Sequence, residues 1–241
     1  MNTCIIHVDG SYCSSTTTKN KHGLGWGLVA EHHDRTHEKH GGYLVQKNQD
    51  LNGAHEDIAL FHALQYMRGH GFTPQTTHIY CDDDLLGYAP TYLAKENYQR
   101  HKAELIEKRI ARAASFTNQT NLVPLIMEEL RTVRLNKVKG HQGHVYQERV
   151  NYLAKWSAHL AVGKKTKRLS FGKWLDKGFT IYMPPEKPHP TLVELGLVDA
   201  KSHTDTTTPY KPRIRVEYAA FVRTIASPES KAKDLSATFS P

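Results

Sequence analysis

The sequence predicts an α/β domain in which helices flank a mixed five-stranded sheet, followed by a basic C-terminal extension. Two observations support this fold class. Strand-like and helix-like segments follow one another in the order three strands, helix, strand, helices, strand, helix, which is typical of a mixed sheet packed under helices. The chain has 241 residues and is 39% apolar, which is sufficient for one good-sized core.

Three strands are expected at the start of the chain. Residues 4–9 alternate between the two faces of a strand, and a turn rich in glycine and serine is expected after Asp9. The stretches GLGWGLVAEHH (23–33) and THEKHGGYLVQ (36–46) have the length and composition of two more strands. We therefore expect an antiparallel meander joined by short turns.

Helical spacing begins at residue 54. Apolar side chains recur every third residue from Ile58 to Met67, and Gly69 and Gly71 supply the end of this helix. Residues 76–82 are predicted to form a fourth strand. A long helix is expected over residues 93–116, with a narrow apolar stripe of Leu105, Ile106, Ile110 and Ala113.

Three further elements complete the predicted domain, which we place at residues 1–163. They are a helix over residues 121–133, a fifth strand over residues 134–140 and a closing helix over residues 145–162. Residues 164–241 open with the run KKTKR and contain many prolines. We predict a basic extension of unknown role that has little core of its own and is flexible over about its last 15 residues.

Composition limits the classes of function. The formal net charge of +8 and the isoelectric point near 9.3 favour a polyanionic partner, nucleic acid first. The chain has no apolar run of about 18 residues and no secretory signal at its N-terminus, so we expect no contact with a membrane. Its three cysteines are unpaired in spacing, which fits a reducing, cytoplasmic location.

Three acidic residues lie at informative places: Asp9 and Asp82 end predicted strands, and Glu56 lies in the first turn of the first helix. If the first and fourth strands are neighbours, the aspartates lie side by side, and a helix over that edge brings Glu56 to them. Carboxylates so close together repel unless cations separate them, and hard oxygen ligands suit magnesium or manganese. The same residue types are also common in turns and caps, which is our interpretation of Asp83 and Asp84.

Four segments carry a resemblance to a known family. They resemble the signature segments of type I ribonuclease H and follow the same order: IIHVDGSY, NGAHEDIALFHAL, HIYCDDDLL and VKGHQGHVYQERVNYLAKWSA. The resemblance covers residues 1–162. Asp9, Glu56 and Asp82 are expected on a strand, a helix and a strand, and this is the order in which the family carries its acidic residues. Integrases and transposases place their glutamate last, and proofreading exonucleases carry Asp-x-Glu on the first strand, where this chain has Asp9, Gly10 and Ser11.

The resemblance implies a metal-dependent endonuclease that hydrolyses the RNA strand of RNA/DNA hybrids by two-metal-ion catalysis, leaving 5′-phosphate and 3′-hydroxyl ends. Asp9, Glu56 and Asp82 would hold two Mg²⁺ ions, with Mn²⁺ as a substitute or the preferred ion. His141 would help to move protons or release product. The hybrid would be read through its minor groove. The candidate substrate contacts are Gly10, Ser11, Asn52, Lys95, Lys102 and Arg109.

The chain departs from the family pattern at two positions. Asn151 stands ten residues after His141, where the family has a fourth aspartate; it keeps an oxygen ligand but loses the charge. We expect one of the two metals to bind more weakly and manganese to be favoured. Leu51 replaces the polar residue often found before Asn52. The alternative is a catalytically weak or inactive protein of the same fold that binds nucleic acid or acts as a scaffold.

Three surface features have further interpretations. The basic residues between positions 95 and 112 would either grip the hybrid or form a solvated helix face balanced by acidic residues of the same helix. Histidines 32, 33, 37 and 40 lack the spacing of a zinc site and are interpreted as surface residues. The extension is a candidate site for a protein partner, and we expect the chain to be a monomer.

Overall fold

The computed structural model describes residues 3–15, 21–33, 35–46, 51, 53–94, 99–138, 144–177, 179–180 and 213–214. The chain divides into two compact units. The first comprises Met1–Lys139 with Arg149–Thr166, and the second comprises Gly140–Glu148 with Lys167–Pro241. The domain boundary predicted at residue 163 stays a prediction.

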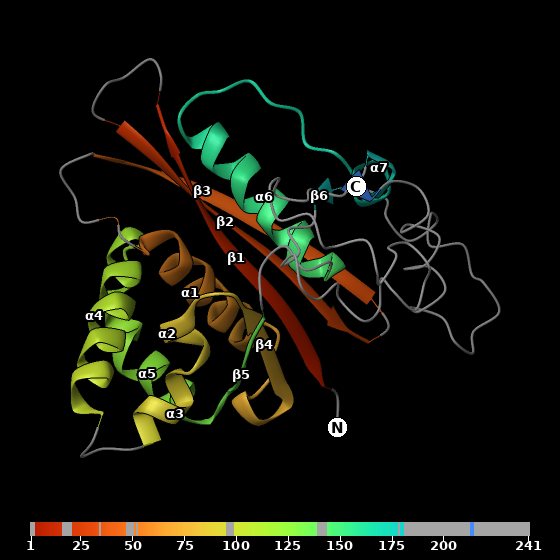
Figure 1. Cartoon of the computed structure of the whole chain (residues 1–241). Helices are drawn as coiled ribbons and strands as arrows, with labels where there is room; N and C mark the ends of the chain where they lie inside the picture. Colours follow the sequence, from red (N-terminus) through yellow and green to blue (C-terminus); the bar gives the residue numbers. More distant parts are fainter. Residues whose placement is uncertain are drawn as a thin grey trace, which may run out of the picture. The chain divides into compact units, whose positions relative to one another are not determined.

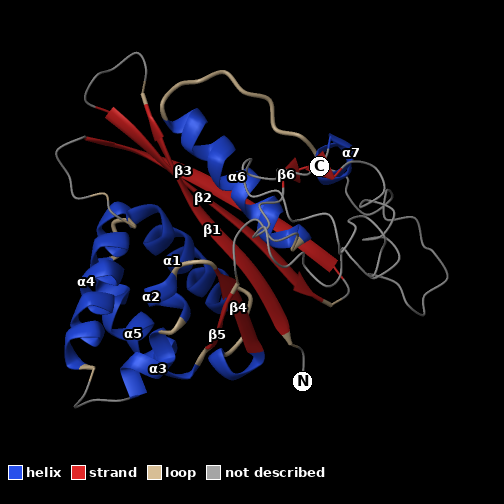
Figure 2. Ribbon diagram, viewed as in Figure 1, coloured by secondary structure: helices blue, strands red, loops and turns tan. Residues whose placement is uncertain are grey.

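The sheet of the first unit has five strands in the order β3-β2-β1-β4-β5, which confirms the predicted mixed sheet. Antiparallel pairs join β1 to β2 and β2 to β3, whereas β4 runs parallel to both β1 and β5. Figures 1 and 2 show the three long strands crossing the first unit with helices on both sides. The strands are β1 (Cys4–Ser14), β2 (Lys21–His32), β3 (Arg35–Gln46), β4 (Thr77–Cys81) and β5 (Arg134–Lys137).

The first strand is longer than predicted, and the expected turn after Asp9 is wrong. Residues 10 and 11 continue β1, because pairing with β2 extends without a break from Ile5 opposite Glu31 to Ser14 opposite His22. Parallel pairing with β4 involves only Cys4 to His7. Beyond His7, β1 therefore has an edge that β4 does not cover.

The helices largely follow the predicted order, with one correction. The long helix expected over residues 93–116 is two helices, α3 ending at Ala94 and α4 beginning at Arg100 after its N-cap residue Gln99. The helices with the two short 3₁₀ turns are α1 (Ala54–Gly69), η1 (Pro74–Thr76), α2 (Asp84–Gly87), α3 (Ala89–Ala94), α4 (Arg100–Phe116), η2 (Thr120–Leu122), α5 (Val123–Thr132) and α6 (Val145–Ala161).

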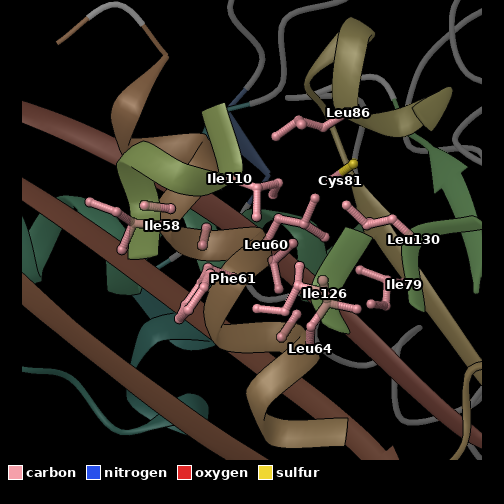
Figure 3. Close-up of a cluster of buried hydrophobic side chains, with 14 of the residues drawn as sticks. Ile58, Leu60, Phe61, Leu64, Ile79, Cys81, Leu86, Ile110, Ile126 and Leu130 are labelled. Carbon is pink, nitrogen blue, oxygen red and sulfur yellow. The ribbon is translucent and has the colours of Figure 1, made fainter. Parts of the chain in front are cut away.

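The core lies between the sheet and helices α1 to α5. The apolar stripe of α1 packs against side chains from β4, α2, α4 and α5 (Figure 3). Ile106, Ile110 and Ala113 of the predicted stripe on α4 are buried, but Leu105 is 40% exposed. Burial of this much apolar surface from five helices fixes α1, and with it Glu56, against the sheet.

Helix α6 packs on the opposite face of the sheet, where glycines of β2 allow its backbone to approach. A Cβ atom on Gly27 would lie only 2.5 Å from the carbonyl oxygen of Val150. Val150, Leu153 and Ser157 are buried as the helical spacing predicts, whereas Leu160 is 42% exposed. Because the glycines of β2 have no side chains, α6 can lie close to the middle of the sheet.

The second unit contains α7 (Phe171–Lys177) and a short antiparallel pair of β6 (Phe179–Thr180) with β7 (Arg213–Ile214). The expected flexibility at the end of the chain falls outside the described residues. Among the helices that the structure describes, none has the length and apolarity needed to span a membrane.

Candidate metal centre

The structure brings together three of the predicted site residues: Asp9 on β1, Glu56 in the first turn of α1 and Asp82 just after β4. One carboxylate oxygen from each lies within 4.8 Å of the others. Parallel pairing of β1 with β4, which sets His7 opposite Tyr80, carries both chains to the same edge of the sheet two residues later. In the part of the chain that the structure describes, this is the one group of His, Cys, Asp or Glu residues close enough to hold a metal ion.

Gly10 determines how closely Glu56 approaches the sheet. A Cβ atom on Gly10 would lie 2.3 Å from the carbonyl carbon of His55, so a larger residue would push α1 away. The N–H group of Gly10, on the edge of β1 that β4 leaves open, donates a hydrogen bond of 3.1 Å to Glu56 Oε2. We expected Gly10 to contact substrate; in this structure its main-chain N–H instead holds a candidate metal ligand.

The electrostatics of the three carboxylates fit a divalent cation. Burial, followed by the charges of Asp9 and Asp82, raises the pKa of Glu56 well above its usual range, although the hydrogen bond from Gly10 opposes the shift. Asp9 itself is only 5% exposed. Water therefore cannot fully relieve the repulsion between the carboxylates, whereas a cation that prefers hard oxygen ligands would relieve it. The donor set consists of carboxylate oxygens, as magnesium and manganese require.

Helix α6, which carries Asn151, packs against the strand that pairs with β1 at Asp9. Gly27, which Val150 covers, pairs directly with Asp9 across the sheet. The helix therefore places the residue just before Asn151 against the cross-strand partner of Asp9. Asn151 is half-buried. Its role as a fourth, neutral ligand stays a prediction.

The two aspartates after Asp82 lie at the start of α2, in agreement with their interpretation as cap residues. Asp83 is the N-cap of α2 and accepts a hydrogen bond of 2.8 Å from the N–H of Leu86. Asp84 forms an ion pair with Lys137 of β5, whose ammonium also donates a 2.6 Å hydrogen bond to the carbonyl oxygen of Asp82. Lys137 thus ties the end of β4 to β5 beside the carboxylates.

The predicted substrate contacts have different outcomes. Lys102 lies over the ring of Tyr92, 4.5 Å from its centroid, and Ser11 is half-buried on β1 two residues beyond Asp9. Arg109 faces inward and pairs with Asp57 and Asp83, so the expectation that it grips the hybrid from the protein surface is not supported. The remaining three predicted residues, Asn52, Lys95 and His141, lie outside the described part of the chain.

A groove of about 510 Å³ lies between α2, α3 and the edge of the sheet at β5, and none of the three carboxylates lines it. Its lining includes His78, Tyr88, Arg134 and Lys137 and contains no acidic residue. Lys137 connects this groove to Asp82 through the hydrogen bond described above. The cationic side chains that line this groove are Arg134 and Lys137, and Lys137 is already paired with Asp84.

Sequence reasoning missed the buried ion pairs next to the centre. Asp57 is completely buried and accepts bonds from Arg109 and Arg112 of α4. A signal was present: Asp57 shares a helical face with Ile58 and Phe61, so a charged residue stands within the apolar stripe. A buried carboxylate requires a cationic partner, and two arginines three residues apart on α4 could have supplied it.

The first 159 residues match one family model. The model is described as RNase H, and the match covers residues 1–159. A curated relative, the ribonuclease H of Syntrophomonas wolfei subsp. wolfei, is 30% identical over 158 residues, which are 64% of this chain and 95% of the relative. The sequence match therefore spans nearly the whole relative and leaves the extension of this chain unmatched.

Solved structures of low sequence identity were also found. The RNase H1 of the halophilic archaeon Halobacterium salinarum NRC-1 is 18% identical, with 64% of this chain and 96% of that chain covered and a TM-score of 0.37. LC11-RNase H1, isolated from compost, was solved in complex with an RNA/DNA hybrid. It is 17% identical in that complex, with 66% of this chain and 99% of that chain covered and a TM-score of 0.40.

Proposed function

The chain belongs to the ribonuclease H family, and on that premise we propose that it hydrolyses the RNA strand of RNA/DNA hybrids with divalent cations held by Asp9, Glu56 and Asp82. The single observation that carries the proposal is the group of three carboxylate oxygens within 4.8 Å of one another, one from β1, one from the first turn of α1 and one from the residue just after β4. Mg²⁺ or Mn²⁺ ions, two per site, would supply Lewis acidity and positive charge beside the scissile phosphate.

Each residue of the centre has a distinct part in this proposal. Asp9, the most buried of the three carboxylates, is the central ligand, with Glu56 and Asp82 on either side. Gly10 holds Glu56 in place through its N–H group. Asn151 completes the set as a neutral ligand. His141 would transfer protons near neutral pH, for which an imidazole is suited.

The net charge of the chain and its candidate contact residues support a nucleic-acid substrate. A chain with a net charge of +8 attracts a polyanion, and nucleic acid is the first such partner to consider. Lys102, Lys95, Ser11 and Asn52 are the proposed contacts to the hybrid. The products would carry a 5′-phosphate and a 3′-hydroxyl, because the attacking water adds to phosphorus and the 3′ oxygen leaves.

The test is cleavage of an end-labelled RNA/DNA hybrid with Mg²⁺ and, separately, with Mn²⁺. Single-stranded RNA, duplex RNA and duplex DNA serve as comparison substrates. We expect cleavage of the hybrid alone, and a loss of at least about 1,000-fold, ~4 kcal/mol, in Asp82→Asn, because one of the charged ligands is removed. Glu107→Gln, at an exposed position on α4, is the control that removes one carboxylate charge away from the centre.

The second candidate function rests on Asn151. If the missing fourth carboxylate has ended catalysis, the protein binds the hybrid but cuts no substrate with either metal. That result would assign the chain to nucleic-acid binding or scaffolding on the same fold.

A further inference from the structure

Arg109 of α4 joins two carboxylates that each follow a candidate metal ligand in the sequence. Its Nε donates to Asp57 Oδ1 at 2.5 Å, and Asp57 follows Glu56. Its Nη1 and Nη2 donate to the two carboxylate oxygens of Asp83, at 3.2 and 2.9 Å, and Asp83 follows Asp82. One planar cation thus connects the first turn of α1 with the segment that leaves β4.

These bonds are shielded from water. The side chain of Asp57 is fully buried, and those of Arg109 and Asp83 are 13% and 17% exposed. Arg112 supports Asp57 from the same helix, with its Nη2 2.5 Å from Asp57 Oδ2. Because a charge left unpaired in such surroundings is costly, the four groups hold one arrangement more firmly than a surface ion pair would.

The ion pairs of Arg109 affect the distance between Glu56 and Asp82, which must be short enough for both to bind the same cation. Glu56 and Asp82 come from different elements, and their negative charges push α1 and the end of β4 apart. Arg109 ties the residues next to them together and opposes that separation. Ligand sets need support of this kind, because displacements well below 1 Å change metal affinity and activity.

We propose that Arg109 is a positioning residue of the carboxylate centre: by bridging Asp57 and Asp83 it sets the separation of Glu56 and Asp82 and thereby the affinity for a divalent cation. The inference rests on the metal centre of the proposed function. It differs from a role in substrate binding, because Nε, Nη1 and Nη2 of Arg109 all donate to groups of the protein, including the carbonyl oxygen of Gly53 at 3.5 Å.

The first experiment measures Mn²⁺ binding to the full chain by calorimetry, without nucleic acid. We expect Arg109→Gln to weaken Mn²⁺ binding by about 10- to 100-fold, the range typical of residues that support metal ligands. Arg109→Lys should fall between that variant and the wild type, because one ammonium cannot form the paired bonds to Asp83. Arg100→Gln, at an 83% exposed position of the same helix, is the charge-matched control and should bind Mn²⁺ normally.

The second experiment separates position from charge. The double variant Asp83→Asn with Arg109→Gln has the net charge of the wild type but no bridge, so its Mn²⁺ affinity should stay low. Recovery of wild-type affinity in the double variant would overturn the proposal in favour of simple charge balance. Thermal unfolding without metal checks that each variant folds; Arg109→Lys, which keeps the charge but cannot form the paired bonds to Asp83, serves if Arg109→Gln does not fold and should also weaken Mn²⁺ binding.

Other outcomes distinguish this inference from the proposed function. Mn²⁺ affinity within twofold of the wild type in Arg109→Gln overturns the inference, whether or not the wild type cuts hybrids. Loss of hybrid binding with intact Mn²⁺ affinity also overturns it and makes Arg109 a substrate contact. A wild-type protein that binds no Mn²⁺ overturns both.

Discussion

The two ends of α1 each gather titratable groups of one kind, and they relieve the crowding in different ways. At the N-terminal end, Glu56 meets Asp9 and Asp82. At the C-terminal end, the ring of His70 lies 5.9 Å from that of His32, which stacks on His37 at 4.6 Å with a 5° angle between the planes. Both clusters lie at element ends, and in both the groups would repel if charged.

The difference lies in what each group can do near neutral pH. Burial and the neighbouring acids raise the pKa of Glu56, because each negative charge added to the cluster is unfavourable, and a bound cation would relieve all three carboxylates at once. Burial, followed by the neighbouring histidines, lowers the pKa of His32. Uncharged imidazoles can then stack without a counter-ion. The carboxylate cluster at the N-terminal end of α1 therefore indicates a metal site more strongly than the histidine cluster at its C-terminal end does.

The largest effect should come from completing the acidic cluster. Asn151→Asp adds a fourth charge to the ligand set, so Mg²⁺ should bind about tenfold more tightly, ~1.4 kcal/mol. Calorimetric titration with Mg²⁺ and Mn²⁺ measures the change, and any preference for Mn²⁺ should shrink. Asn118→Asp, at an exposed position beyond the end of α4, adds the same charge as a control. Unchanged affinity would show that residue 151 does not reach the cation.

A smaller effect is expected on the protein without metal. Asp82→Asn removes one of the charges that raise the pKa of Glu56, so the metal-free variant should be more stable than the wild type by about 1 kcal/mol. The same variant should gain less stability than the wild type when Mn²⁺ is added. Urea unfolding with and without Mn²⁺ measures both quantities. A metal-free variant less stable than the wild type would mean that the cluster is not under repulsion.

The smallest effect concerns the histidine cluster and appears as a dependence on pH. The folded pKa values of His32 and His37 are lowered from the ordinary value near 6.5, so the unfolded chain takes up protons first. Their contribution to stability is complete above about pH 6.5 and is lost as the pH falls toward the folded values.

Replacing both residues, His32→Asn with His37→Asn, should flatten this part of the stability profile. Free energies of unfolding from pH 5 to 8 provide the comparison, with His101→Asn, at an exposed position on α4, as the control. Part of the slope will remain, because burial lowers the pKa of His62 to about 4. A double variant with the slope of the wild type would show that the cluster does not resist protonation.

Local pattern accounts for what was predicted correctly. Alternation and helical spacing involve residues that are close in sequence, so β4, α1 and the buried face of α4 could be assigned without a structure. The residues of the carboxylate centre were also predictable. The two aspartates were placed at neighbouring strands, and the parallel pair of β1 and β4 confirms that arrangement.

Long-range pairing accounts for the rest. From the local pattern we predicted that the first strand ends at Asp9. Pairing with β2 instead continues β1 to Ser14. Gly10 is therefore a strand residue, and the first turn of α1 packs against it. The basic residues of α4 were expected either to grip nucleic acid or to form a solvated helix face. Arg109 instead faces two acids that are 52 and 26 residues away in the sequence.

The sequence by itself therefore determined the order of elements, the mixed sheet and the three acids, because each depends on local periodicity and residue chemistry. Only the tertiary structure decided how far β1 runs and which charges are buried together. A buried arginine and a solvated one have the same local pattern, and they differ only in the carboxylates that distant segments bring to them.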